Sequence, residues 1–169
     1  MLNIFFPDEY VQSIHHIDYD SLKKRGIKNF IFDIDNTLEP YDIEKPTEKS
    51  ASLLRKLVSM GFAVLLISNN SKKRVEKFNE ELKLPATFRA RKPLKSAVLK
   101  VMKETGAKPG DTVFIGDQVF TDVCCAKRLH IYVILVMPIA NRDEFSVRLK
   151  RNLEKKVINK YLKLKTQTK

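Results

Sequence analysis

Long hydrophobic runs are missing from this sequence of 169 residues. Its longest apolar segments, FAVLLI at 62–67 and IYVILVM at 131–137, are far shorter than the ~20 residues that a membrane-spanning helix needs. The N-terminus, MLNIFFPDEY, lacks the basic start and the apolar length of a secretory signal. We therefore expect a cytoplasmic protein, in which both apolar runs are buried strands.

Cysteine and aromatic residues are also scarce. The only two cysteines, Cys124 and Cys125, are neighbours, so they cannot frame a set of structural disulfides or form a zinc site by themselves. Internal repeats and low-complexity segments are absent, and 43% apolar with 31% charged residues is typical of a folded domain. The 9% aromatic content and the lack of a known RNA-binding motif argue against a nucleic-acid-binding module.

Acidic residues are few near the C-terminus. Residues 142–169 contain ten Lys or Arg against three Asp or Glu, a surplus of seven in a total net charge of +12. Within them, apolar residues recur every four positions: Phe145, Leu149, Leu153, Val157 and Tyr161. This pattern predicts a basic amphipathic helix, which either packs on its own domain or lies on an anionic membrane.

Strand-like and helix-like patterns alternate along the rest of the chain. The strand-like runs are 29–34, 62–68, 86–89, 112–116 and 131–137. Helical patterns lie between them, at 50–60, 72–82, 94–105 and 120–129. This alternation predicts an α/β fold, a five-stranded parallel sheet with helices on both faces. We expect that core, with an N-terminal arm at 1–27, to occupy residues 1–137, and the basic tail to occupy 138–169.

Chemically useful side chains follow four of the predicted strands. They are Asp33 and Asp35 in NFIFDIDNTLEP, Ser68 in ISNN, Lys92 in RARKP, and Asp117 and Asp122 in GDQVFTD. Because ligands bind at the carboxyl ends of the strands in parallel sheets, we expect these side chains to form one site.

The residue types in this set suit phosphate chemistry. Three carboxylates, Asp33, Asp35 and Asp117, would repel one another unless a cation lay among them, and oxygen ligands suit Mg²⁺. Asp33 could then attack a phosphoryl group, while Asp35 protonates the leaving oxygen and later deprotonates the attacking water. Ser68 and Lys92 would neutralise the phosphoryl oxygens.

Several of these residues also have an ordinary structural interpretation. Asp117 and Asp122 could form an Asx turn and a helix N-cap, and Lys92 has rivals in Arg89 and Arg91. In the catalytic interpretation Asp122 completes the metal shell, directly or through water. Four motifs in order, each after a predicted strand, favour that interpretation.

The motifs resemble those of the haloacid dehalogenase superfamily of phosphatases. DIDNT at 33–37 corresponds to the first motif of that family, and Ser68 in ISNN to the second. Lys92 in RKP corresponds to the third motif, and GDQVFTD at 116–122 to the fourth. The resemblance implies a hydrolase with a Rossmann-like fold.

The same resemblance implies roles for individual residues. Asp33 corresponds to the nucleophile and Asp35 to the acid/base. The metal, Mg²⁺, is expected on the Asp33 carboxylate, the Asp35 main-chain carbonyl and Asp117.

The chain also resembles the YqeG-type subfamily, through its FPDEY arm and the FDIDNTL and GDQVFTD segments, up to about Met137. That subfamily is similar to the mitochondrial phosphatidylglycerophosphate phosphatase, which implies a lipid-phosphate substrate. If the basic tail lies on an anionic membrane, the protein would be peripheral at the inner face of that membrane. One alternative is a phosphatase of soluble sugar phosphates, nucleotides or phosphoproteins. Another is a non-catalytic domain that binds anionic partners such as RNA.

No separate cap domain fits between the motifs. The interval 35–68 has room for a flap at 39–46, one helix and a strand, and the interval 70–92 has room for a helix and a short strand. We therefore expect an open, capless site. Such a site suits a phosphate carried on a large or membrane-bound molecule.

Overall fold

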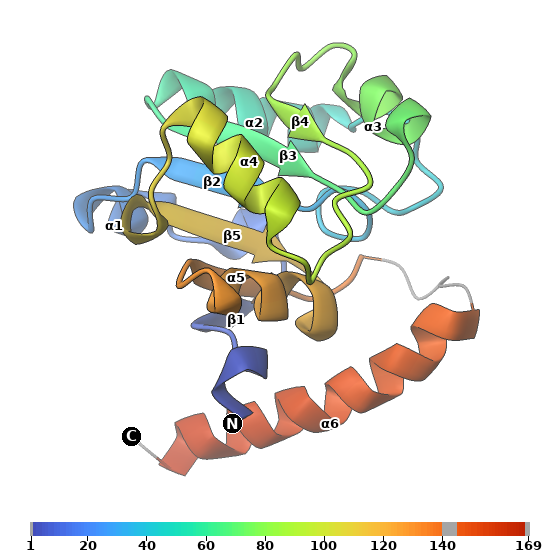
Figure 1. Ribbon diagram of the computed structural model, residues 1–169. Coiled ribbons are helices and arrows are strands. Elements are labelled where there is room, and N and C mark those ends of the chain that lie inside the picture. Colours follow the sequence, from blue (N-terminus) through green and yellow to red (C-terminus); the bar gives the residue numbers. More distant parts are fainter. Residues whose placement is uncertain (1, 140–144, 168–169) are drawn as a thin grey trace.

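A computed structural model describes residues 2–139 and 145–167. Six parallel strands form one sheet in the order β1-β6-β5-β2-β3-β4 (Figure 1). The strands are β1 (Glu9–Val11), β2 (Asn29–Phe32), β3 (Ala63–Ile67), β4 (Ala86–Thr87), β5 (Thr112–Gly116) and β6 (Tyr132–Val136). The α-helices are α1 (Tyr19–Lys24), α2 (Glu48–Ser59), α3 (Lys72–Asn79), α4 (Ser96–Thr105), α5 (Cys124–Arg128) and α6 (Phe145–Gln167). Short helical turns are η1 (Leu2–Phe5), η2 (Ile14–His16), η3 (Pro109–Asp111) and the π-helical turn η4 (Val119–Val123).

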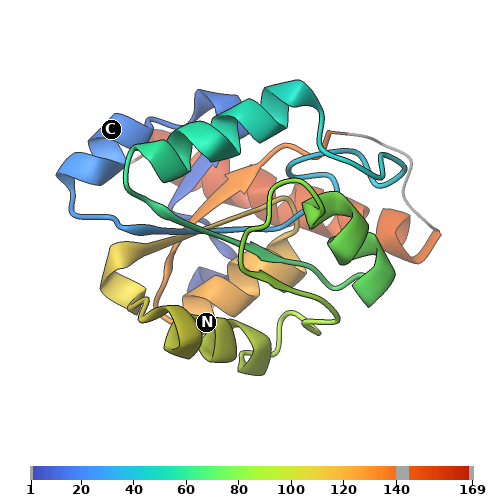
Figure 2. The same cartoon turned by 90° about the horizontal axis from the view of Figure 1, so that it is seen from above.

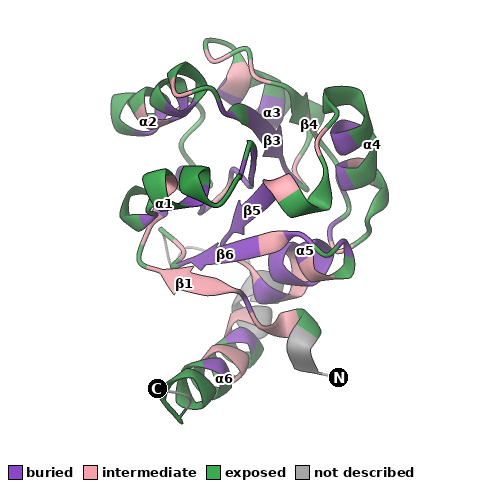
Figure 3. Ribbon diagram, turned by 90° about the vertical axis from the view of Figure 1, so that its left-hand side faces the viewer, coloured by how far each residue is buried: buried purple, intermediate pink, exposed green. Residues whose placement is uncertain are grey.

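The sheet has one strand more than the five that the sequence predicts. β1 lies in the predicted N-terminal arm and pairs with β6, with Glu9 opposite Ile134 and Val11 opposite Val136. Its three residues are only partly buried, as Figure 3 shows in pink, so they lack the alternation that reveals a longer strand. The prediction of five strands was wrong in this respect, and the parallel sheet with helices on both faces is confirmed.

Alternating side chains of the strands build a separate core on each face of the sheet. In β2, Phe30 and Phe32 belong to a core that includes residues of α1, α2 and α3, whereas Ile31 belongs to one that includes residues of α4 and α5. Figure 2 shows α1 and α2 on one side of the sheet and α4 and α5 on the other. Burying a Phe side chain stabilises a fold by about 1.5–3 kcal/mol. The strand that leads into the first motif is therefore firmly held from both sides.

The C-terminal helix α6 packs on the core beside α5 and the N-terminal segment (Figure 1). Val157 and Ile158 contact the core on that face, and Tyr161 is only 5% exposed. Of the two arrangements that the sequence left open, the structure has the packed one. The side chains of Phe145 and Leu149, which begin the predicted stripe, lie outside the described residues. Within residues 2–139 and 145–167, no helix combines the length and apolar content needed to span a bilayer.

All six strands run in the same direction, so the segments that follow them gather at one edge of the sheet. β2 lies between β5 and β3, which brings the first, second and fourth motifs next to one another. Gly116 ends β5 at this edge, and a Cβ atom there would lie 2.5 Å from the side chain of Asp122. Because glycine has no Cβ atom, the Asp122 side chain can pack directly against the end of β5.

Candidate active site

Asp33 is fixed at the end of β2 by its backbone and its carboxylate. Its N–H donates to the Ile115 carbonyl at 2.9 Å, which continues the pairing with β5. The Lys92 ammonium contacts Asp33 Oδ1 at 2.5 Å, and the Thr37 hydroxyl donates to Oδ2 at 3.3 Å. Burial raises the pKa of Asp33 well above its ordinary value, although the charge of Lys92 opposes this shift. The carboxylate is thus dehydrated, oriented and held next to a cation.

Lys92 bridges two carboxylates of the site. Its Nζ lies 2.5 Å from Asp33 Oδ1 and 2.7 Å from Asp122 Oδ1, and the side chain is almost fully buried. Burial alone would lower the pKa of Lys92, but the charges of Asp122 and Asp33 outweigh it and raise the pKa above its ordinary value. Lys92 is therefore a cation at neutral pH. Its rivals, Arg89 and Arg91, are exposed.

Three buried carboxylates converge beside Lys92. One oxygen each from Asp33, Asp117 and Asp122 lies within 4.8 Å of the others. Burial raises the pKa of Asp117 to about 7, with Arg151 opposing the shift. Crowded carboxylates of this kind favour a bound cation, and a set of hard oxygen donors fits Mg²⁺. The residues present therefore fit the metal that the sequence predicts.

Asp35 lies at the same edge, but its carboxylate is directed toward other partners. It accepts hydrogen bonds from the Ser68 hydroxyl and the Asn70 amide, both at 3.2 Å, and from Arg74 Nε at 3.1 Å. The carboxylate is not part of the three-carboxylate cluster. The predicted metal contact of Asp35 through its main-chain carbonyl stays a prediction.

Sequence analysis missed Arg74 as a member of the site. This residue lies in the first turn of α3, and its side chain is mostly buried. It pairs with Asp35 and also donates a hydrogen bond to the Glu44 carbonyl of the flap at 2.9 Å. Its position just after the second motif was a usable signal, but the neighbouring Lys72 and Lys73 made it look like one of several surface cations.

Arg151 of α6 was also missed. Its guanidinium pairs with the Asp117 carboxylate and donates a hydrogen bond to the Asp117 main-chain carbonyl at 2.8 Å. It also pairs with Glu154 at 3.3 Å, and buried Glu154 accepts a hydrogen bond from the Phe120 N–H at 3.2 Å. The regular spacing of cations in the tail gives no reason to select Arg151, because the contact depends on how α6 docks.

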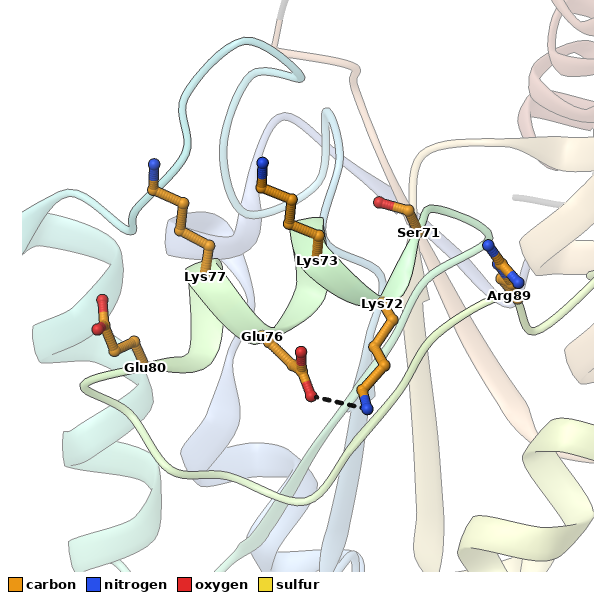
Figure 4. A pocket seen from close by; sticks show the side chains of 7 residues that line it. All are labelled: Ser71, Lys72, Lys73, Glu76, Lys77, Glu80 and Arg89. Atoms are coloured by element: carbon orange, nitrogen blue, oxygen red, sulfur yellow. Dashed lines mark ion pairs between the residues drawn. The ribbon is translucent and has the colours of Figure 1, made fainter.

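Two hollows lie next to α3. The first, about 770 Å³, is lined by Ser71, Lys72, Lys73, Glu76, Lys77, Glu80 and Arg89 and contains none of the predicted site residues (Figure 4). The second, about 330 Å³, is lined by Tyr41, Asp42, Glu44, Asn70, Ser71, Lys73, Arg74 and Lys77, between the flap and α3. Because Asn70 and Arg74 both contact Asp35, the second hollow adjoins the predicted acid/base.

Comparison with known proteins defines the class to which this fold and site belong. Residues 14–130 match the model of the haloacid dehalogenase-like hydrolase family, so the chain belongs to that family. The predicted α/β fold of this superfamily is confirmed, with six strands instead of five, and the protein is a phosphatase of the haloacid dehalogenase superfamily.

Two relatives are similar to the chain in sequence, and one solved structure is similar to it in fold. The chain is 38% identical over 160 residues to the probable phosphatase YqeG of Bacillus subtilis (strain 168), covering 94% of this chain and 93% of that protein. It is 27% identical over 168 residues to phosphatidylglycerophosphate phosphatase 1, chloroplastic/mitochondrial, of Arabidopsis thaliana, covering 93% of this chain and 48% of the plant protein. Its fold is similar to a haloacid dehalogenase family enzyme of Bacteroides thetaiotaomicron in complex with magnesium and inorganic phosphate, with a TM-score of 0.52, 17% identity, and coverage of 72% of this chain and 99% of that one.

Proposed function

We propose that the protein is a Mg²⁺-dependent phosphomonoesterase that forms an aspartyl-phosphate on Asp33 and hydrolyses phosphatidylglycerophosphate. The observation that carries the proposal is the buried contact between Asp33 and Lys92 beside Asp117 and Asp122. Three buried carboxylates face only two cationic side chains, Lys92 and Arg151, so the cluster keeps an excess of negative charge that a metal ion would neutralise.

Asp33 is the nucleophile in this proposal. Its carboxylate oxygen forms a bond to phosphorus while the bond from phosphorus to the ester oxygen breaks. The cluster of Asp33, Asp117 and Asp122, with the Asp35 main-chain carbonyl, would hold the metal ion. When bound, Mg²⁺ neutralises charge on the carboxylates and on the phosphoryl oxygens. Lys92 contacts Asp33 directly and adds a second cation next to the transferred group.

Asp35 is the acid and base. In its protonated form it gives a proton to the ester oxygen as that oxygen leaves as an alcohol. A water molecule then attacks the phosphorus of the aspartyl-phosphate and passes a proton to Asp35, which releases inorganic phosphate and restores Asp33. Ser68, Asn70 and Arg74 hold the Asp35 carboxylate, so its position relative to Asp33 is set before substrate arrives.

The lipid substrate is supported by two observations. The Arabidopsis relative is named for activity on phosphatidylglycerophosphate, although this chain spans about half its length. In addition, the interval between β2 and β3 contains the flap and α2, and the interval between β3 and β4 contains α3, so neither holds a cap domain. A site without a lid admits a phosphate whose carrier remains in a larger assembly.

The test is release of inorganic phosphate from phosphatidylglycerophosphate in anionic vesicles, with and without Mg²⁺, beside a panel of soluble phosphomonoesters. Wild type is compared with Asp33→Asn and with the matched control Asp20→Asn, which alters an exposed carboxylate on α1. We expect turnover of the lipid that requires Mg²⁺, is lost in Asp33→Asn and is retained in Asp20→Asn.

Each other outcome has a definite meaning. Turnover of soluble esters alone would keep the mechanism and reject the lipid substrate. Full turnover by Asp33→Asn would reject the covalent mechanism. Acid quenching followed by mass spectrometry should find one phosphoryl group on the peptide that contains Asp33 in wild type, and finding it on another residue would also reject the mechanism.

A further inference from the structure

Exposed apolar side chains gather at the edge of the sheet that carries the site. Six of them lie on segments that follow β2, β4 and β6, and each is between 38% and 53% exposed. These residues, here named the rim, are Tyr41, Ile43, Phe88, Leu94, Met137 and Ile139. A single exposed apolar residue is ordinary, but several on segments at one edge of a sheet indicate an interaction surface.

The rim segments are bonded to the segments that form the site. The Ile139 N–H donates to the Asn36 carbonyl at 3.1 Å, between Asp35 and Thr37 in the first motif. The Ala90 N–H donates to the Ser68 carbonyl at 3.0 Å, which ties the segment after β4 to the second motif. Two of the segments that carry rim residues therefore border the site.

Two rim residues, Phe88 and Leu94, lie in a segment with strong positive charge. Residues 88–95, FRARKPLK, contain no acidic residue and place Arg89, Arg91 and Lys95 at the surface. None of these three forms an ion pair with a residue that the structure describes. Arg89 and Arg91 also have positive φ angles, 47° and 54°, which is a costly backbone conformation for arginine.

Three glutamates near this segment pair with lysines rather than with Arg89, Arg91 or Lys95. Glu44 pairs with Lys77, Glu76 with Lys72, and Glu80 with Lys45. Figure 4 shows the Lys72–Glu76 pair on one side of α3, with Lys73 and Lys77 extending from the other side and Arg89 across the hollow. Arg89, Arg91 and Lys95 thus remain available to an anionic surface.

We propose that the rim, together with Arg89, Arg91 and Lys95, docks the protein on the surface of an anionic lipid bilayer with the site facing the headgroups. This inference rests on the lipid substrate proposed above and extends it to the binding surface. The apolar side chains enter the boundary of the acyl region while the cations pair with lipid phosphates. The headgroup phosphate then reaches Asp33 while its lipid stays in the bilayer.

The structure favours this edge over α6, the membrane surface suggested by the sequence. Val157, Ile158 and Tyr161 of α6 contact the core, so they are not available to lipid. Among the described side chains of α6, the exposed apolar residues are Leu153, Leu162 and Leu164. These three exposed leucines form a smaller apolar set than the six residues of the rim.

The test is co-sedimentation of the full chain with vesicles of phosphatidylglycerol and, separately, of phosphatidylcholine. Neither lipid is a phosphomonoester, so binding is measured without turnover. The rim variants are Phe88→Ser/Leu94→Ser and Arg89→Gln/Arg91→Gln. Val58→Ser is the matched control, because Val58 is 45% exposed on α2. Leu162→Ser tests α6, and circular dichroism checks that every variant is folded.

We expect wild type to bind phosphatidylglycerol vesicles and not phosphatidylcholine vesicles. The apolar rim variant should bind about tenfold more weakly and the variant without both arginines about 25-fold more weakly, whereas Val58→Ser and Leu162→Ser should bind like wild type. Loss of binding in Leu162→Ser with retention in the rim variants would overturn the proposal. So would the absence of vesicle binding, or equal binding to both lipids.

The same samples separate this inference from the proposed function. If wild type binds anionic vesicles through the rim but hydrolyses no phosphomonoester, the docking surface stands and the catalytic proposal fails. If wild type hydrolyses a soluble ester but binds no vesicle, the docking surface fails and the mechanism stands. Rim-dependent binding to an oligoribonucleotide without vesicle binding would identify RNA as the partner and overturn the inference.

Discussion

The guanidinium of Arg151 on α6 pairs with the carboxylate of Asp117, which belongs to the three-carboxylate cluster. Residues 34 positions apart in the sequence thus meet at the centre of the site. Because Asp117 is a predicted metal ligand, the arginine and a divalent cation share one partner. Docking of α6 and binding of the metal should therefore influence each other.

Replacing Arg151 by Ala should strengthen Mg²⁺ binding about tenfold, since a competing positive charge is removed from Asp117. Isothermal titration calorimetry measures the affinity, and limited proteolysis measures how firmly α6 stays docked. Lys156→Ala, which alters an exposed cation of the same helix, is the control and should leave the affinity unchanged. If Arg151→Ala bound Mg²⁺ with the affinity of wild type, Arg151 and the metal would not compete for Asp117.

Replacing Arg74 by Met should lower kcat by about tenfold to a hundredfold, because Asp35 loses a guanidinium that orients its carboxylate. KM should change less than kcat if Arg74 mainly positions the acid. Steady-state kinetics on a soluble phosphomonoester measures both constants, and Arg74→Lys should restore part of kcat. If Met raised KM alone, Arg74 would instead be a substrate-binding residue.

Replacing Gly116 by Ala should destabilise the fold by about 1–3 kcal/mol. The added Cβ atom would lie 2.5 Å from the Asp122 side chain, so the strand end or the carboxylate must move. Urea unfolding measures the loss. Gly110→Ala is a matched control, since a Cβ atom at Gly110 has no neighbour within 4 Å. If both variants had the same free energy of unfolding, Asp122 would move away from the added Cβ atom without destabilising the fold, which would contradict the prediction.

The two cysteines should react slowly with thiol reagents in the native protein. Both are buried, and burial raises the pKa of the Cys125 thiol to about 11 and also raises that of Cys124. Because the thiolate is the reactive form, a rise from 9.0 to about 11 lowers the reactive fraction of Cys125 at pH 8 about a hundredfold. Reaction with a chromogenic disulfide should be slow at pH 8 and complete in denaturant. Rapid reaction of both thiols at pH 8 without denaturant would show that α5 opens readily.

Much of the site could be predicted from sequence because its residues follow strands with clear patterns. Asp33 and Asp117 come directly after buried apolar runs, and parallel strands end at a common edge. Lys92 was selected over Arg89 and Arg91 by its motif, and the structure buries Lys92 alone of the three. The roles assigned to these residues stay predictions until the experiments above are done.

What the sequence by itself determined was the set of strands in the core, the parallel sheet and the motif residues, since these depend on local hydrophobic patterns and on the order of elements. Only the tertiary structure decided the pairing of β1 with β6, the contact between Arg74 and Asp35, and the docking of Arg151 against Asp117. Each of these depends on how one element packs against another distant in the chain. A charged side chain in a periodic basic helix has the same local pattern at every turn, so only the packed fold selects the one that reaches a buried carboxylate.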